Sequence, residues 1–368
     1  MVQRAISEQI EKEGTAMKIL FLGETYRADA QTWIKGIEEA SGCKIDTDEI
    51  KTIRFKPIRA IQAFLFIGRL LWGRFFGPKY DIVLAERSTS YGFFSLFTNA
   101  KIKVVAQQGI SDIYPNTFFS RGYKKILQRL VYKNVDVIHA WGNAMVPAML
   151  KSGADPKTIV VLPKGIDLKK YYFTDHFSHN KPFELRAIVT RALASDYNHY
   201  IIIQAVAELK KKGVKLDVDI VGDGPLKGYL ISLSKELKVD DRVHFLGRIP
   251  NEELPNYLAK CPLYISTPIT EGASSSLMEA MASGCFPIVT DLPGNKSFIK
   301  NGINGLLVDK NSVASLEEAL EYAAIKTEIL SNAAVMNMEY AFKNLDRGSN
   351  MRLFFKHYLN CLANTVKN

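Results

Sequence analysis

The chain has 368 residues, of which 47% are hydrophobic and 23% are charged, which is an ordinary globular composition with room for two cores. Its formal net charge of +10 favours acidic partners such as anionic substrates or lipids. The four cysteines are scattered and contain no CxxC pair, which excludes a disulfide framework and indicates buried or incidental thiols in a reducing compartment.

Residues 1–16 are polar and lack the apolar segment of a secretory signal, so they are predicted to be an N-terminal extension. The first strand then begins near Met17. No apolar run reaches the ~18–20 uncharged residues that cross a bilayer. The six histidines form no cluster, and no metal site is predicted.

Short apolar runs alternate with longer amphipathic ones along the chain, which is typical of parallel α/β architecture. The strands predicted in the first half are Ile19–Leu22, Ile82–Ala85, Val104–Ala106, Val135–Ala140 and Ile159–Leu162. Those predicted in the second half are Leu185–Thr190, Leu216–Val221, Val243–Phe245, Leu263–Thr267, Phe286–Val289 and Gly305–Val308. Helices are expected at Ser315–Ala324, Ile329–Phe342 and Gly348–Ala363.

A turn at Pro163–Asp167, followed by a polar aromatic stretch, marks the best domain boundary. We therefore expect two doubly wound domains that face a central cleft. The predicted divisions are 1–16 (extension), 17–167 (first domain), 168–183 (connector), 184–347 (second domain) and 348–368 (C-terminal helix).

The most informative stretch is Tyr264–Asp309, in which Glu271 and Glu279 have seven residues between them. A strand, a loop of small residues and a helix start form a geometry that receives phosphate, because backbone amides and the helix dipole point at the anion. Ionised carboxylates suit vicinal hydroxyls, since they accept two O–H bonds. Phosphate and diols together indicate a nucleotide sugar. The loop residues predicted to bind it are Gly272, Ala273, Ser274, Ser275 and Ser276.

An alternative interpretation is purely structural. Ser276 and Glu279 have the spacing of a capping box, in which Glu279 would only satisfy a backbone amide at a helix start.

The same segment resembles the donor-site signature of the family 4 retaining glycosyltransferases, which have the GT-B fold. The matching residues are Glu279-Ala280-Met281-Ala282, Gly284, Pro287-Ile288-Val289, Gly294 and Asn304-Gly305-Leu306-Leu307-Val308. The turns at Leu162–Asp167 and Val221–Pro225 and the run Phe245–Arg248 also fit, so the resemblance extends from about residue 158 to 309. It implies a C-terminal helix that crosses back to the first domain.

The resemblance implies that Arg191, at the end of a predicted strand, contacts the donor phosphates, and that Glu271 holds the donor sugar. A guanidinium there would stabilise the leaving diphosphate. The family has a lysine five or six residues later, where this chain has Asp196 and Tyr197. Residues considered as its replacement are Tyr197, Asn198, His199 and Lys296.

The run from Gly222 to Gly228 superficially resembles a dinucleotide fingerprint, but its third glycine is one position late and it follows the wrong strand. A tight turn with Pro225 at the first helical position is the simpler interpretation. The resemblance places Gly222 and Gly224 near the nucleotide base.

Acceptor-side candidates lie at the ends of strands in the first half. They are Gly23, Gln108, Gly109 and Asp112.

Two stretches, Lys51–Lys79 and Phe118–Lys133, interleave basic and large apolar residues. This pattern suits the interface of an anionic membrane, and a core helix with snorkelling basic residues is the alternative. No nucleic-acid-binding motif is present. The predicted membrane residues are Arg69, Trp72, Arg74, Lys124, Lys125 and Arg129.

Together these features predict a metal-independent, retaining hexosyltransferase without a cofactor. It would transfer sugar from a UDP- or GDP-type donor to a glycan or lipid-linked saccharide, in cell-surface polysaccharide or glycolipid biosynthesis. Its predicted location is cytoplasmic, on the inner face of the cell membrane. The alternatives are a GT-B phosphorylase, a sugar-nucleotide epimerase, or a degenerate membrane-associated scaffold.

Overall fold

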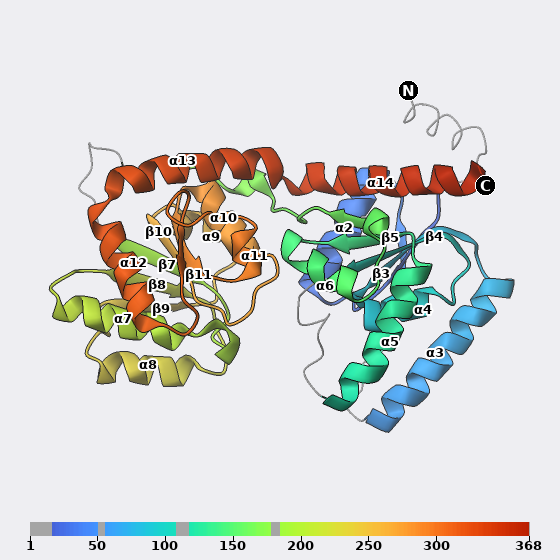
Figure 1. Ribbon diagram of the computed structural model, residues 1–368, viewed down its shortest axis with the longest axis horizontal. Coiled ribbons are helices and arrows are strands. Elements are labelled where there is room, and N and C mark those ends of the chain that lie inside the picture. The colour runs from blue at the N-terminus through green and yellow to red at the C-terminus, as the bar shows by residue number, and fades with distance from the viewer. Residues whose placement is uncertain (1–16, 51–55, 108–117, 178–184, 368) are drawn as a thin grey trace. The chain divides into compact units, whose positions relative to one another are not determined.

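The computed structural model describes residues 17–50, 56–107, 118–177 and 185–367, and the chain divides into two units (Figure 1). The first unit comprises residues 1–164 and 347–368, and the second comprises residues 165–346. The chain therefore passes between the units twice. The two passages lie side by side, because Ile166 and Asp346 form a parallel bridge and the Ile166 amide donates to the Leu345 carbonyl at 2.9 Å.

The first unit is built on a parallel sheet of six strands in the order β2-β1-β3-β4-β5-β6. These strands are β1 (Ile19–Leu22), β2 (Ile45–Asp48), β3 (Tyr80–Glu86), β4 (Ala100–Gln107), β5 (Val137–Ala140) and β6 (Ile159–Val161). The central strands are almost wholly buried, as expected of a parallel sheet with helices on both faces.

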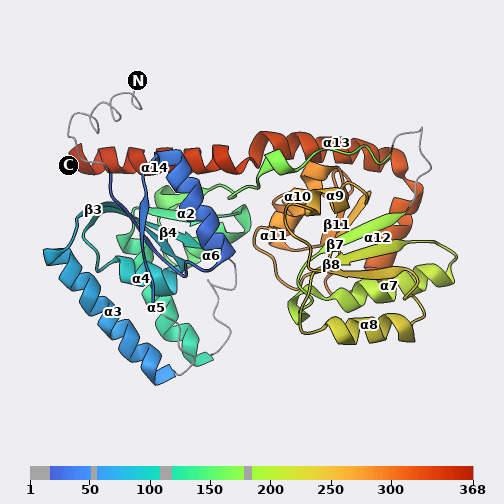
Figure 2. The ribbon, with the colours of Figure 1, turned by 180° about the vertical axis from the view of Figure 1, so that it is seen from behind.

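The helices of this unit are α2 (Ala28–Ser41), α3 (Lys56–Phe76), α4 (Gly92–Ser95), α5 (Phe118–Asn134), α6 (Val146–Lys151) and α14 (Arg347–Lys367). The C-terminal helix α14 packs along α2, as both ribbon views show (Figures 1 and 2). Trp33 of α2 donates to the Tyr358 hydroxyl at 3.3 Å, and His139 lies 2.7 Å from the same hydroxyl. Burial lowers the pKa of His139 to about 3, so this aromatic cluster is an uncharged part of the core.

The second unit repeats the architecture with the strand order β12-β11-β10-β7-β8-β9. Its strands are β7 (Arg186–Thr190), β8 (Asp217–Val221), β9 (Val243–Gly247), β10 (Leu263–Ser266), β11 (Phe286–Thr290) and β12 (Leu306–Val308). Its helices are α7 (His199–Lys211), α8 (Lys227–Glu236), α9 (Leu254–Leu258), α10 (Ser275–Ser283), α11 (Pro293–Lys296), α12 (Val313–Ile325) and α13 (Thr327–Asn344). Two separate apolar cores pack against this sheet, one with α7, α8 and α12 and the other with α9 and α10.

The prediction of two doubly wound parallel sheets is confirmed, as is the return of the C-terminal helix to the first unit. Every predicted strand is present within a few residues. The sequence missed β2, because Ile45-Asp46-Thr47-Asp48 has a single buried apolar residue. Edge strands of this kind carry too little hydrophobic signal to be recognised from sequence.

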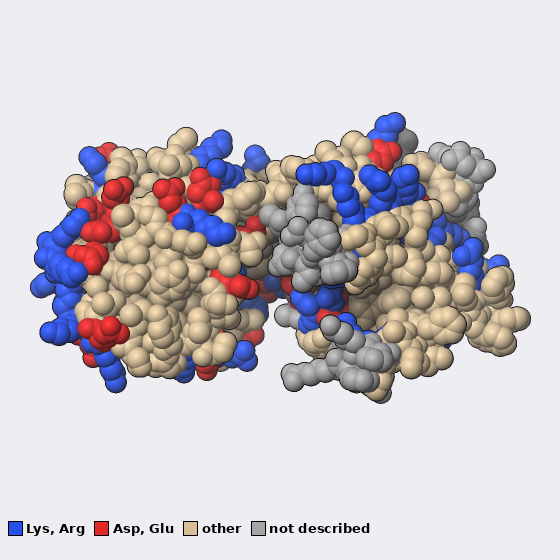
Figure 3. Space-filling view, turned by 60° about the horizontal axis from the view of Figure 1, so that its bottom comes forward, with Lys and Arg blue, Asp and Glu red and all other residues tan. Residues whose placement is uncertain are grey.

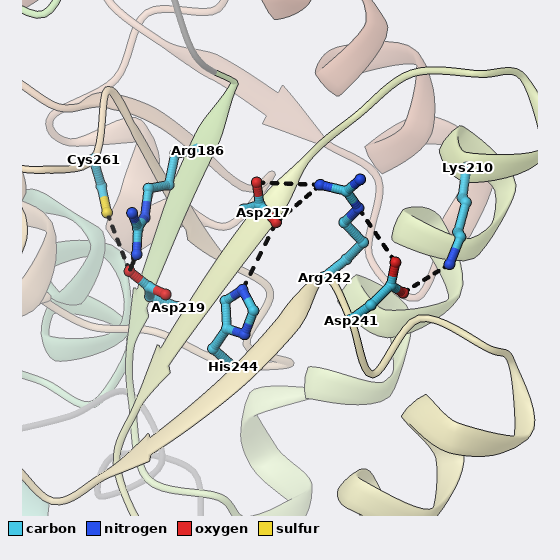
Figure 4. Close-up of polar contacts among 8 residues, drawn as sticks. All are labelled: Arg186, Lys210, Asp217, Asp219, Asp241, Arg242, His244 and Cys261. Atoms are coloured by element: carbon cyan, nitrogen blue, oxygen red, sulfur yellow. Dashed lines mark hydrogen bonds and ion pairs between the residues drawn. The ribbon is translucent and has the colours of Figure 1, made fainter.

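Ion pairs join the strands of the second sheet near its amino-terminal edge (Figure 4). Arg186 donates to Asp219 through Nε at 3.0 Å and Nη2 at 2.7 Å. The Asp219 side chain is only 4% exposed, whereas Arg186 is 38% exposed. Burial raises the pKa of the neighbouring Cys261 thiol to about 12, so this thiol stays protonated and donates to Asp219. Arg242 similarly joins β9 to Asp217 at 3.3 Å. The ion pairs at this edge therefore stabilise the second sheet.

Separate replacement of each partner of the Arg186–Asp219 pair should have unequal effects on the free energy of unfolding. Arg186→Met leaves a buried carboxylate without its cation, and we expect it to lower the free energy of unfolding by about 1.5–3 kcal/mol near neutral pH. Asp219→Asn keeps an acceptor for Arg186 and should cost less.

Urea unfolding of both variants near neutral pH measures this difference. Equal losses of unfolding free energy in the two variants would contradict the account.

Candidate donor-binding site

In the second sheet, the direction in which successive strands are added reverses between β7 and β10. These strands are parallel neighbours, with Leu263 opposite Ala187 and Tyr264 opposite Ile188. From β7 the chain continues to β8 on one side, and from β10 it continues to β11 on the other. In open α/β sheets ligands bind beyond the carboxyl ends of the strands at such a point. The two segments that leave it carry Arg191 and Glu271.

Arg191 and Glu271 meet at this edge. Arg191 forms an ion pair with Glu271, and its Nη2 also donates to the Ser274 hydroxyl at 2.5 Å. The two charged side chains are only 14% and 11% exposed. Burial alone would lower the pKa of Arg191, but the neighbouring Tyr264 and Glu271 raise it, so the guanidinium stays charged. Its Nε is buried and has no hydrogen-bond partner among the described residues.

The loop before α10 is fixed by contacts that require small residues. A Cβ atom at Gly294 would lie 2.4 Å from the Glu271 carbonyl oxygen and 2.6 Å from that of Gly272. The start of α11 therefore packs directly on the loop, and only glycine fits there. The Gly272 amide donates to the Glu271 carboxylate at 3.1 Å. These contacts hold the loop beside Arg191.

Helix α10 begins at Ser275, and its N-cap is Ser274, whose hydroxyl accepts from the Leu277 amide at 3.2 Å. The capping-box interpretation of Ser276 and Glu279 is therefore wrong, because the cap lies two residues earlier. Ser276 instead donates to the Thr190 carbonyl at 3.1 Å. Glu279 lies one turn into the helix and is partly exposed.

The remaining loop residues differ in their exposure. Ser275 is exposed, whereas Gly272 and Ala273 are partly buried. With α10 starting at this point, the free amides of its first turn and the cation of Arg191 lie at the same edge of the sheet. This combination suits an anion.

The glycine turn after β8 packs against the same segment. A Cβ atom at Gly222, which has a φ of 149°, would lie 2.1 Å from the Arg191 carbonyl oxygen, and one at Gly224 would lie 2.5 Å from that of Leu193. The predicted helix start at Pro225 is wrong, because α8 begins at Lys227 after the N-cap Leu226. The turn is thus longer than expected, and it supports the backbone of the residues that follow Arg191.

Tyr197 occupies the region where the resemblance implied a lysine. Its ring lies 5.2 Å from the Arg191 guanidinium, a cation–π distance. Asn198 is buried, has a φ of 50°, and donates to Asn311 at 2.6 Å. His199 contacts the Ala192 carbonyl at 2.9 Å, and burial lowers its pKa. Of the polar candidates on this segment, Tyr197 is therefore the one that contacts Arg191.

The other cation considered, Lys296, pairs with Asp291 at 2.7 Å. Among the described residues there is no group of three or more His, Cys, Asp or Glu side chains that could hold a metal ion.

The acceptor-side candidates are only partly described. Gln108, Gly109 and Asp112 lie outside the described residues. Gly23 follows β1, and the space beside its Cα is filled by the protein itself, because a Cβ atom would lie 2.5 Å from the Phe21 ring and 2.8 Å from Glu86.

The sequence missed an ion pair at the corresponding edge of the first sheet, where the strand order reverses between β1 and β3. Arg87 contacts Glu24 at 2.7 Å, and the Glu24 amide donates to Glu86 at 3.0 Å. Arg87 has a φ of 59°, which is costly for a residue with a side chain, and it opens a short π-helix. The signal that could have found it is the position of Arg87, two residues after a predicted strand.

The predicted membrane residues all lie in the first unit. Arg69, Trp72 and Arg74 are on α3, and Lys124, Lys125 and Arg129 are on α5. Within the described ranges, no helix is long and apolar enough to cross a bilayer.

Comparison with known proteins agrees with the geometry of the second unit. Residues 173–336 match the family model described as glycosyl transferases group 1. This match covers most of the second unit. The predicted family resemblance is thereby confirmed, and the fold is GT-B.

One solved structure similar to this chain is that of HepE from Anabaena in complex with UDP-glucose. It has a TM-score of 0.73 and 16% sequence identity, and the match covers 94% of this chain and 99% of the other.

A similar curated protein is the N-acetylgalactosamine-N,N'-diacetylbacillosaminyl-diphospho-undecaprenol 4-alpha-N-acetylgalactosaminyltransferase of Campylobacter jejuni. It is 27% identical, and the match covers 70% of this chain and 65% of the relative. The alpha-monoglucosyldiacylglycerol synthase of Acholeplasma laidlawii is 25% identical, with 49% of this chain and 48% of the relative covered. The chain thus spans about half to two thirds of the length of these relatives.

Two N-cap serines allow the anion site to be tested separately from helix stability. Ser274→Ala removes the cap of α10 and a contact of Arg191, whereas Ser312→Ala removes only the cap of α12, where the hydroxyl accepts from the Ser315 amide at 3.1 Å. Each variant should lose about 1 kcal/mol of unfolding free energy. Only Ser274→Ala should weaken pyrophosphate binding in calorimetry. Equal pyrophosphate affinities in the two variants would contradict an anion site at α10.

Proposed function

We propose that the protein is a retaining glycosyltransferase that moves a sugar from a nucleoside-diphosphate donor to an acceptor hydroxyl. The observation that carries this proposal is the cluster of Arg191, Glu271 and Ser274 at the start of α10. A buried cation and a helix N-terminus suit a diphosphate, and a carboxylate beside them suits sugar hydroxyls.

Each group has a distinct role in the proposed reaction. Arg191 and the amides of residues 272–276 bind the diphosphate, Glu271 binds hydroxyls of the donor sugar, and Glu279 binds the ribose diol. As the bond between the sugar and the diphosphate breaks, negative charge grows on the leaving phosphate. A guanidinium held in place before the reaction stabilises this charge more in the transition state than in the ground state.

The proposed stereochemical course is retention by front-side attack. The acceptor oxygen forms its bond to the anomeric carbon on the face that the diphosphate leaves, and the leaving phosphate oxygen takes the acceptor's proton. We further propose that the sugar is a hexose and that the reaction needs neither a metal ion nor another cofactor. The nucleotide sugar is the co-substrate.

We favour UDP as the first donor to test, because the similar HepE structure holds UDP-glucose. The named relatives act on an undecaprenol-linked saccharide and in the synthesis of a glucosyldiacylglycerol. They support a glycan or lipid-linked acceptor, a role in polysaccharide or glycolipid biosynthesis, and a cytoplasmic location on the inner face of the cell membrane.

Glu279→Ala tests the ribose assignment. We expect it to weaken nucleotide binding by about 1.5–3 kcal/mol, because a hydrogen bond to a charged group is lost. Glu318→Ala, on an exposed position of α12, is the matched control and should bind like the wild type. Calorimetry with the preferred nucleotide measures both affinities. A folded Glu279→Ala protein with wild-type affinity would remove Glu279 from the donor site.

A further inference from the structure

The helix α3 has a second apolar face that points away from the protein. Its inner face buries Phe66 and Leu70, and the Phe66 ring lies 5.1 Å from that of Phe94. Large apolar side chains also follow one another at intervals of three, four and seven residues on the opposite face, and they are 60–76% exposed. These outer residues are Ile61 (60%), Phe64 (76%), Leu65 (64%), Trp72 (68%), Phe75 (75%) and Phe76 (72%).

Helix α5 presents a shorter stripe of the same kind. Its outer apolar residues are Tyr123, Ile126 and Leu130, which are 57%, 70% and 44% exposed. Exposed Lys125 and Arg129 run beside this stripe. In both ribbon views α3 and α5 project from the same side of the first unit (Figures 1 and 2).

Such a surface is unusual for a protein that exposes it only to water. Contiguous apolar patches of this extent mark interaction sites. The Trp72 and Phe76 rings pack on each other, with centroids 4.5 Å apart, yet both remain more than two-thirds exposed. Their mutual packing therefore leaves most of their apolar surface available to a partner.

The charges around these stripes favour one kind of partner. Neither α3 nor α5 contains an Asp or Glu residue. At 100° of rotation per residue, Arg69 borders the outer apolar face of α3, whereas Arg74 lies nearer the inner face but is exposed. Arg69 is held in place by an ion pair with Asp48 and by stacking on Phe66 at 5.0 Å. The space-filling view shows a broad uncharged area at the right of the molecule, with Lys and Arg along its borders (Figure 3).

We propose that the outer faces of α3 and α5 form a docking surface for an anionic lipid bilayer. In this arrangement Phe64, Trp72, Phe75 and Phe76 enter the boundary between headgroups and acyl chains, and the flanking Arg and Lys side chains contact lipid phosphates. Tryptophan and basic residues are the side chains that stabilise a helix lying in this layer. This inference rests on the proposed function and extends it. The surface would hold the enzyme where a lipid-linked acceptor is presented.

Trp72 supplies a direct probe of insertion. The chain has three tryptophans, and the other two, Trp33 and Trp141, are 1% and 3% exposed. We expect vesicles of phosphatidylcholine mixed with phosphatidylglycerol to shift the Trp72 emission to shorter wavelength, and brominated phospholipids to quench it. Trp72→Phe should lose this response and still sediment with the vesicles. If the protein binds vesicles but its emission spectrum does not change, the proposed insertion of Trp72 is wrong.

Matched variants test the two parts of the surface. Replacing Trp72, Phe75 and Phe76 by Ser, or Arg74, Lys125 and Arg129 by Glu, should weaken co-sedimentation with these vesicles on the order of tenfold or more. The control variants alter similarly exposed residues of the second unit, with Tyr229, Ile303 and Ile325 replaced by Ser, or Lys211, Lys235 and Lys326 by Glu. They should bind like the wild type.

Each of three outcomes would overturn the proposal. The first is a wild type that sediments with no vesicle, and the second is equal vesicle binding by the surface and control variants. The third is a Ser variant that loses a dimer without any change in vesicle binding, which would make the surface a contact between two copies. Titration of UDP into the same variants separates this proposal from the enzymatic one. Vesicle binding without nucleotide binding would leave the docking surface intact and refute the donor site.

Discussion

The ion pair between Arg191 and Glu271 is the interaction on which the rest of the donor site depends. A guanidinium that is 14% exposed needs a compensating charge, and Glu271, in the loop after the neighbouring strand, supplies it. The parallel pairing of β7 and β10 brings both segments to one edge of the sheet. The contact of Gly294 with the Glu271 and Gly272 carbonyls then fixes the loop, and Ser274 starts α10 beside the cation.

In the proposed reaction this pair changes partners. A bound diphosphate would supply the negative charge that Arg191 requires and release Glu271 to accept hydroxyls of the donor sugar. The aromatic ring of Tyr197, 5.2 Å from the guanidinium, replaces the lysine of the family pattern with a neutral side chain. The diphosphate would therefore be neutralised by one arginine and the helix amides. In this arrangement Arg191 would have to stabilise more of the negative charge on the leaving diphosphate than it would in a site with two cations.

The sequence predicted those parts of the molecule that rest on strong local signals. Buried parallel strands are continuous apolar runs, so both sheets and the strand-end position of Arg191 could be predicted. Features that are decided by tertiary contacts could not be predicted from the sequence. Ser274 rather than Ser276 caps α10, in a loop whose carbonyls at Glu271 and Gly272 pack on Gly294. The Arg87–Glu24 pair joins residues that follow two different strands, β3 and β1, and the sequence does not indicate the left-handed backbone of Arg87.

The most direct test of the central claim is calorimetric titration, without metal, of UDP, GDP, ADP and the matching nucleotide sugars into the wild-type protein and into Arg191→Ala. The account predicts micromolar binding of one nucleotide by the wild type and a loss of that binding in Arg191→Ala. If no nucleotide binds to the folded wild type, or if Arg191→Ala binds as tightly, the cluster around Arg191 is not a donor site. A phosphorylase or a scaffold without turnover would then describe the protein better.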